Sequence, residues 1–188
     1  MALFRTVAPE VEPVTVGDLR KFLRLDHDSE DDLLEGLIRA AREDIEASCG
    51  LALIEQGWRM TLDAVPRSGR VLLRRHPVRT IVSLTVYGAD GEASLVNPGT
   101  YRLDAHSRPA CLHFLEMPGS VAAMNGIEID FVAGFGEAGT DVPDLIKRAM
   151  ISLAAHWFEF RAVHTDVRRA SYPVGHERLL APWRERRL

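Results

Sequence analysis

Three glycines in the C-terminal third of the chain have the spacing of a dinucleotide-binding loop. Gly134, Gly136 and Gly139 form G-x-G-x-x-G between a strand-like run and a helix-like run. In such a loop the third glycine lies inside the helix, and an acid about 20 residues further on ends a second strand. Here the helical pattern begins only after Gly139, Glu159 falls inside it, and no second strand follows. We interpret the glycines as a sharp turn from a sheet into a helix. Nucleotide binding is the alternative that thermal shifts with NAD, NADP, ATP and GTP would test.

Two further groups of residues resemble metal sites but lack required members. The run DHDSEDD, residues 26–32, has alternate acids like a calcium loop, yet Asp31 and Leu37 occupy the places of the required glycine and glutamate. Acids at the start of a helix favour its positive end, which explains them without an ion. The seven histidines form no H-E-x-x-H motif and no pair at metal spacing beside a cysteine pair. We interpret His156, beside an apolar helical stripe, as a packed or interface residue.

The chain also lacks the motifs of common catalytic nucleophiles and of phosphate transfer. It contains no G-x-S-x-G elbow and no P-loop lysine motif. We therefore expect no catalytic residue, no cofactor-binding residue and no metal ligand.

Helical patterns occur at both ends of the chain. Residues 13–25 predict a short helix with a capping box of Thr15 and Asp18. Apolar residues at helical spacing predict a second helix over residues 33–49, capped by Ser29 or Asp28 and ended by Gly50. A third helix begins near Pro143. Its predicted buried stripe comprises Leu145, Ile146, Ala149, Met150, Leu153, Ala154, Trp157 and Phe158.

The middle of the chain has the pattern of short β-strands. From about residue 51 to residue 132, alternating and β-branched runs are separated by glycine and proline, with an Asp90-Gly91 turn between two of them. This spacing predicts a small antiparallel sheet or sandwich inserted between helices.

Composition and charge narrow the class of protein. The 188 residues, 46% hydrophobic and 27% charged, are typical of a soluble globular protein. The sequence has no apolar run of about 18 residues, so no membrane span is expected. Arg5 and nearby acids argue against a signal peptide. Cys49 and Cys111 are expected to be buried thiols in a protein made in a reducing cytoplasm.

The charge is distributed unevenly along the chain. Residues 1–50 hold twelve acids against six bases, and residues 158–188 hold seven arginines against four acids, within a net charge of −4. An acidic start and a basic end suggest contacts between copies or with partners, although both could be solvated faces. The basic end could also hold nucleic-acid phosphates. Because it interleaves leucine and tryptophan with arginine, we favour a protein-docking peptide over a DNA-binding one.

The order of segments along the chain resembles one protein family. PVTVGDLRKFLRLDHDSEDDLLEGLIRAAREDIEASCG is followed by LIEQGWRMTLD, HPVRTIVSLTVYGADG, YRLD, IEIDFVAGFG, VPDLIKRAMISLAAHWFEFR and LLAPWRERRL. Over about residues 13–188 this order is similar to the head–tail connector (adaptor) family of tailed bacteriophages and phage-like gene transfer agents.

The resemblance implies an α+β fold: a small antiparallel helical bundle with an inserted antiparallel β subdomain and an extended C-terminal arm. The implied parts of this single structural unit are the N-terminal helices at 13–50, the β-rich insertion at 51–133, the last long helix at 134–163 and the arm at 164–188. The arm would contact the portal protein of the capsid vertex. The implied portal-binding residues are Leu179, Leu180, Pro182, Trp183, Arg184, Arg186, Arg187 and Leu188.

The resemblance also implies the role. Such a protein is not an enzyme and carries no cofactor. It assembles in the bacterial cytoplasm into a ring, in the particle a dodecamer, under the portal at the head–tail junction of the virion, and joins the DNA-filled head to stopper and tail proteins. Double-stranded DNA passes through the ring without specific binding, and no membrane is involved. The alternative is a DNA-binding packaging accessory protein that uses the basic C-terminal tail.

Overall fold

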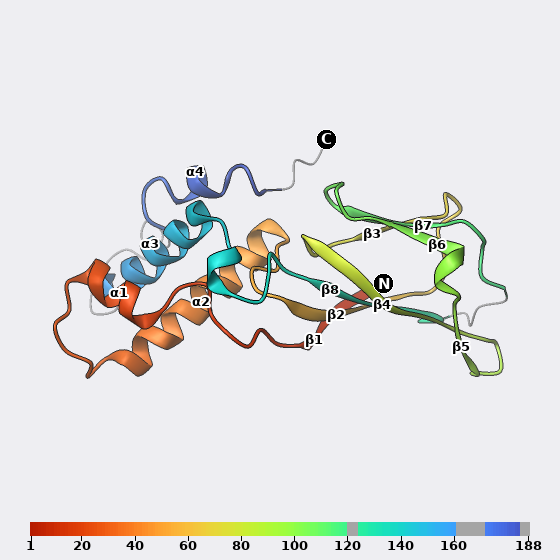
Figure 1. Ribbon diagram of the computed structural model, residues 1–188, viewed down its shortest axis with the longest axis horizontal. Helices are drawn as coiled ribbons and strands as arrows, with labels where there is room; N and C mark the ends of the chain where they lie inside the picture. The colour runs from red at the N-terminus through yellow and green to blue at the C-terminus, as the bar shows by residue number, and fades with distance from the viewer. Residues whose placement is uncertain (120–123, 161–171, 185–188) are drawn as a thin grey trace. The chain divides into compact units, whose positions relative to one another are not determined.

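The computed structural model describes residues 1–119, 124–160 and 172–184, and the chain divides into two compact units (Figure 1). The sheet unit consists of Met1–Pro9 and Glu55–Phe135. The helical unit consists of Glu10–Ile54 and Gly136–Leu188. The predicted α+β class with antiparallel sheets is confirmed.

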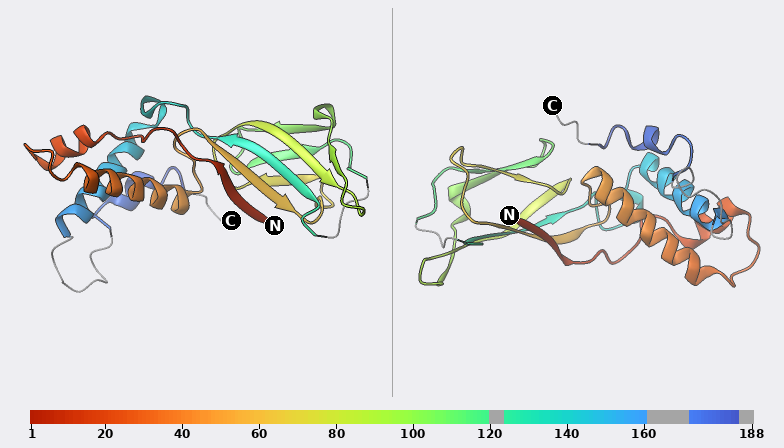
Figure 2. Two further views of the ribbon diagram at one scale, coloured as in Figure 1. Left: turned by 90° about the horizontal axis from the view of Figure 1, so that it is seen from below. Right: turned by 180° about the vertical axis from the view of Figure 1, so that it is seen from behind.

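The sheet unit contains two antiparallel sheets that lie one over the other (Figures 1 and 2). Five strands pair in the order β1-β2-β8-β4-β5, and three pair in the order β3-β7-β6. The strands are β1 (Ala2–Val7), β2 (Gln56–Leu62), β3 (Arg70–Leu73), β4 (Val78–Tyr87), β5 (Ala93–Leu95), β6 (Tyr101–Asp104), β7 (Ala110–Phe114) and β8 (Ile127–Ala133).

Alternation of apolar and polar residues explains the packing of these strands. Along β8, residues Ile127, Ile129 and Phe131 are buried, and the residues between them are half-buried. Successive side chains of a strand point to opposite faces, so one face of β8 joins the core and the other carries Glu128 and Asp130. The predicted turn at Gly91 is present, with a positive φ of 84°, between β4 and β5.

The helical unit packs α1 (Val16–Leu23), α2 (Asp31–Cys49) and α3 (Asp144–Phe160) against one another, and α4 (His176–Leu180) against α3. The predicted capping box is confirmed, because Thr15 accepts from the N–H of Asp18 and the Asp18 carboxylate accepts from the N–H of Thr15. Gly50 ends α2 with φ of 67°. The core residues of this unit include Leu19, Leu34, Ile38, Ile45, Ile146 and Leu153.

Two local predictions were wrong, and one strand was not predicted. The residue at the start of α2 is Glu30, without a side-chain capping bond, rather than Ser29 or Asp28. Leu145, predicted in the buried stripe of α3, is 51% exposed. The strand β1 was not predicted, because most of its side chains are exposed and its register depends on β2, about fifty residues away. Within the described ranges, none of the helices has the length and apolar character needed to cross a membrane.

Candidate interaction site

The C-terminal segment is held on the helical unit by buried side chains of α4. Leu180 is completely buried, and His176 is nearly so. Both lie on the short helix that contacts α3. Burial of the imidazole lowers the pKa of His176 below its ordinary value of 6.5, because water no longer stabilises its charged form. The segment therefore carries a neutral, packed histidine at neutral pH.

Polar contacts also fix this segment against α2. The Tyr172 hydroxyl donates to Asp44 Oδ1 at 2.8 Å, and its ring stacks on His176 with 5.3 Å between centroids. The hydrogen bond to Asp44 is the main reason that the pKa of Tyr172 is raised. Arg184 forms an ion pair with Glu177 at 3.5 Å. The described part of the arm is thus a folded segment, not an extended one.

The predicted portal-binding residues differ in how they are placed. Leu180 is buried, Leu179 and Trp183 are half-buried, and Pro182 and Arg184 are exposed. The last three, Arg186, Arg187 and Leu188, lie outside the described residues. The exposed and half-buried members come from one short stretch around the end of α4, so they can contact a partner together while Leu180 anchors the segment.

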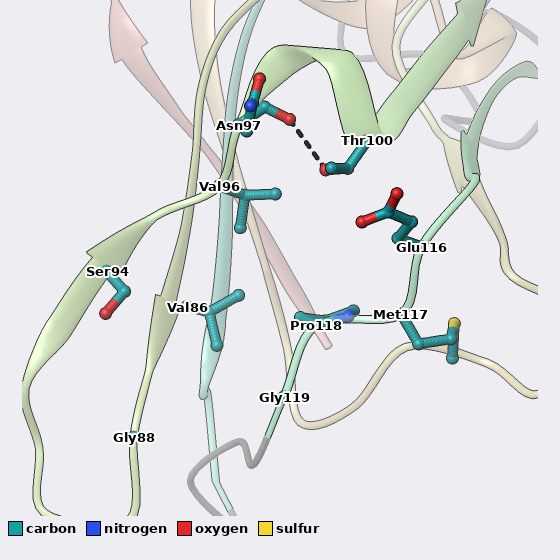
Figure 3. Close-up of a pocket in the computed structure, with 10 residues that line it drawn as sticks. All are labelled: Val86, Gly88, Ser94, Val96, Asn97, Thr100, Glu116, Met117, Pro118 and Gly119. Carbon is teal, nitrogen blue, oxygen red and sulfur yellow. Dashed lines mark hydrogen bonds between the residues drawn. The ribbon is translucent and has the colours of Figure 1, made fainter.

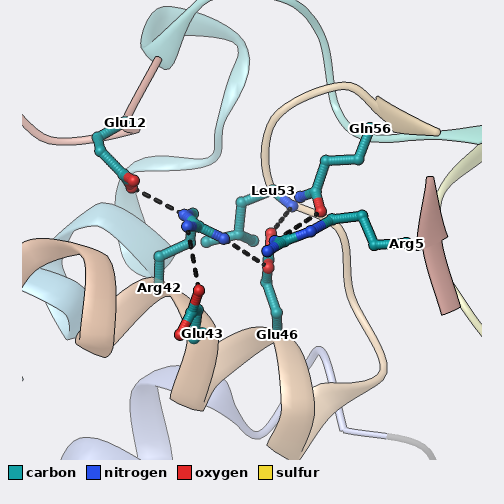
Figure 4. A network of polar contacts seen from close by, with 7 residues as sticks. All are labelled: Arg5, Glu12, Arg42, Glu43, Glu46, Leu53 and Gln56. Carbon is teal, nitrogen blue, oxygen red and sulfur yellow. Dashed lines mark hydrogen bonds and ion pairs between the residues drawn. The ribbon is translucent and has the colours of Figure 1, made fainter. Parts of the chain in front are cut away.

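A buried arginine organises the other side of the helical unit (Figure 4). Arg42, 2% exposed, donates to Glu12 at 2.8 Å and to Glu46 at 2.9 Å, and Glu43 lies 3.7 Å away. The second Glu46 oxygen accepts from the backbone N–H of Leu53 at 2.8 Å. Burial alone lowers the pKa of Arg42, but the bond to Glu12 and the charge of Glu46 outweigh it and raise the pKa. The guanidinium therefore stays charged.

This network joins two connecting segments to α2. Glu12 precedes α1, and Leu53 follows α2. Sequence reasoning missed the network, although a signal existed: Arg42 and Glu46 fall beside Ile38, Ala41 and Ile45 on the face predicted to be buried. Charged side chains on the apolar face of a helix are seldom buried unless they form an ion pair with each other or with a neighbour.

The glycine-rich loop has a packing role. A Cβ at Gly139 would lie 2.9 Å from the carbonyl oxygen of Pro13, and one at Gly136 would collide with the side chain of Asp141. Gly136 also forms an isolated bridge with Ile54. The loop then passes through a 3₁₀ turn, η2 (Gly139–Asp141), before α3 begins. These close approaches support the interpretation of the glycines as a tight connection between β8 and α3.

A pocket of about 340 Å³ lies in the sheet unit between the β4–β5 hairpin and the segment that follows β7 (Figure 3). Its described lining carries Glu116 as the sole titratable side chain, beside hydroxyl, amide and apolar groups. This lining pairs no acid with a base. Throughout the described residues, no group of three His, Cys, Asp or Glu side chains could hold a metal ion. Cys49 and Cys111 are buried free thiols, as predicted.

Comparison with known proteins agrees with a structural role. Residues 13–86 match the family described as phage gp6-like head-tail connector protein. No curated protein matches the chain significantly. A chain in the neck of an empty gene transfer agent (GTA) particle, computed with C6 symmetry, has a TM-score of 0.85 and 29% identity, over 100% of this chain and 97% of that chain. Chains from a native GTA virion and from a native GTA neck computed with C12 symmetry cover the same shares at 29% identity, with TM-scores of 0.84 and 0.76.

The fold and these comparisons define a class of protein: a structural component of a phage-like particle. Residues 13–86 match the phage head–tail connector family, and the whole chain has the fold of a GTA neck chain.

Proposed function

We propose that the chain is the head–tail adaptor of a tailed phage or gene transfer agent. It forms a ring at the head–tail junction of the virion and joins the DNA-filled head to the tail. The observation that carries this proposal is the likeness to the GTA neck chain, which extends over the whole of this chain at 29% identity. The helical unit would serve as the antiparallel bundle, and the sheet unit as its β-rich insertion.

The proposed partners are the portal protein on the head side and stopper or tail-completion proteins on the tail side. A dodecameric ring is consistent with the C12 symmetry of the native GTA neck. A ring requires each copy to present two different surfaces to its neighbours, a heterologous contact that closes by rotation. DNA would pass through this ring without specific binding.

Electron microscopy of particles from producing cells that lack this gene alone tests the function. We expect DNA-filled or leaking heads beside separate tails, and joined particles when the gene is restored on a plasmid. Intact tailed particles in the deletion strain would contradict the adaptor role. Separate tails together with empty heads that never retained DNA would instead favour the packaging accessory function.

We propose that residues 179–188 contact the portal protein, with Leu180 anchoring the segment to α3. A truncated chain that ends at Ala181 keeps Leu180 and removes Pro182, Trp183 and Arg184. It should fold with an unchanged far-UV circular dichroism spectrum and lose co-sedimentation with portal-bearing heads. Full-strength co-sedimentation would show that the docking surface lies elsewhere. The substitution Glu137→Gln, at an exposed position outside this segment, is the control.

A further inference from the structure

One face of the three-stranded sheet carries exposed positive charge on its two outer strands. Arg70 of β3 lies opposite His113 of β7, which lies opposite Arg102 of β6. The other face carries Val71, Leu73 and Leu112, which are buried. Each arginine lies opposite His113, so neither has an acid opposite it across the sheet. This row of basic side chains therefore does not stabilise the sheet by itself.

The arginines of this face have no ion-pair partner among the described residues. We define the basic face as the exposed side chains of Arg70 and Arg102 with their neighbours Arg67 and Arg74. Within the described residues, none of these four guanidinium groups forms an ion pair. The acid of this sheet, Asp104, accepts from the N–H groups of His106 and Ser107 at 3.1 and 3.2 Å.

The opposite sheet shows the contrast. There, Arg59 of β2 forms two bonds to Asp130, at 2.7 and 2.8 Å, and lies 3.2 Å from Glu128. Arg59 is thus paired with acids across strands, whereas the arginines of the basic face are left for a partner outside the sheet. Electrostatic complementarity of this kind sets the register and specificity of a protein interface.

The helical unit carries a surface of opposite sign. Residues 26–35 contain six acids and no lysine or arginine. Asp26, Asp28, Asp32 and Glu35 are exposed, and Asp31 lies 3.4 Å from Arg20. We call these residues the acidic start of α2. They are the densest run of acids in the chain.

Both surfaces also carry an exposed leucine. Leu72, 50% exposed, lies between Arg70 and Arg74 along the chain, and Leu33, 40% exposed, lies within the acidic start of α2. Protein interfaces combine apolar contacts with arginine, whereas a DNA-binding face gains most of its affinity from phosphate contacts. The leucines and the net charge of −4 favour a protein partner.

We propose that the basic face of one copy binds the acidic start of α2 of the neighbouring copy in the ring. This inference rests on the proposed adaptor function. It supplies the two different surfaces that a closed heterologous ring requires, since the basic face belongs to the sheet unit and the acidic start belongs to the helical unit.

A charge exchange between two variants tests the contact. The first variant carries Arg70→Glu with Arg102→Glu, and the second carries Asp28→Lys with Glu35→Lys. Each variant alone places like charges against each other at the contact between copies. In producing cells that lack the native gene, the fraction of heads joined to tails should therefore fall about tenfold or more. Co-expression of the two variants should restore joined particles, because alternating copies recover opposite charges at every contact and an even-numbered ring closes. A single chain that carries all four substitutions should also form joined particles.

Controls separate this contact from folding and from general charge effects. Arg70 and Arg102 are exposed and form no ion pair within the described residues, so thermal unfolding of the purified Arg70→Glu, Arg102→Glu variant should not occur at a clearly lower temperature. Lys21→Glu with Arg24→Glu makes the same change in net charge away from the basic face, and should leave joined particles at the native level.

Three results would overturn the proposal. Native numbers of joined particles with Arg70→Glu and Arg102→Glu would show that the basic face is not an assembly contact. Failure of co-expression to restore assembly would assign the face to a different partner. The third result combines two measurements. In fluorescence polarisation, the native chain would bind duplex DNA in a salt-sensitive way, and the Arg70→Glu, Arg102→Glu variant would not. If Asp28→Lys with Glu35→Lys also left assembly unaffected, the basic face would be assigned to DNA. In each case the adaptor function stands if deletion of the gene still separates heads from tails.

Discussion

At the scale of single residues, Arg42 makes the strongest prediction about stability. Replacing it by methionine removes the buried guanidinium that bonds both Glu12 and Glu46, whose side chain is 6% exposed. Removing one partner of a buried ion pair costs about 3–5 kcal/mol. Arg42→Met should therefore lower the free energy of unfolding of the helical unit by about that amount, as measured by urea denaturation.

A second substitution separates the charge effect from packing. Arg42→Met combined with Glu46→Gln keeps an acceptor for the N–H of Leu53 and leaves no buried charge at position 46. This double variant should recover part of the loss. Arg39→Met, at an exposed position on the same helix, should change stability by no more than about 0.5 kcal/mol. Equal losses in the single and double variants would mean that packing of the Arg42 stem, not charge, supplies the stability.

His176 gives a prediction about pH. Its folded-state pKa lies below 6.5 chiefly because of burial, while Asp44 raises it and Arg184 lowers it. As the pH falls, His176 is therefore protonated at a higher pH in the undocked segment than in the docked one. Docking of α4 is at full strength above about pH 6.5 and weakens as the pH falls below that value. Protection factors in residues 176–184, which correct each rate for the intrinsic pH dependence of exchange, should be smaller at pH 5 than at pH 7.5. With His176→Phe this loss of protection should disappear, and its persistence would point to another titrating group.

At the scale of elements, α4 depends on one side chain for its position. Leu180 is fully buried, so Leu180→Asp places a carboxylate where water is excluded. We expect the segment that contains α4 to detach, with loss of protection from hydrogen exchange in residues 176–184. Protection in α1 and in the core of α2 should persist. Ala181→Asp, at the neighbouring exposed position, is the control and should leave protection unchanged.

The same scale shows what the sequence could predict. Helix boundaries followed from local chemistry, as at Thr15 and Gly50, and β8 followed from strict alternation. β1 and the docking of α4 could not be predicted, because each depends on a surface supplied by residues far along the chain. Of the candidate site, the sequence predicted a set of C-terminal residues that contact a partner, but not that Leu180 is buried in its own unit. The basic face also required the sheet, because only strand register brings Arg70 and Arg102 to either side of His113.

At the scale of the whole molecule, each unit has its own core, and the helical unit is interrupted by the sheet unit in sequence. Ile54 and Gly136 lie side by side in a β-bridge, so the ends left by removing residues 55–135 are close together. A flexible glycine-serine linker of about six residues has a root-mean-square span of roughly 13 Å, enough to join them. A chain of residues 10–54, this linker and residues 136–188 should therefore fold.

This shortened chain separates folding from assembly. It keeps Leu19, Leu34, Ile45, Ile146 and Leu153 in its core, so circular dichroism should show a helical protein that unfolds cooperatively. It lacks the basic face, and should therefore fail to join heads to tails in producing cells that lack the native gene. A helical protein that nevertheless forms joined particles would show that the helical unit supplies both surfaces of the ring contact. An unfolded chain would show that the two units depend on each other for stability.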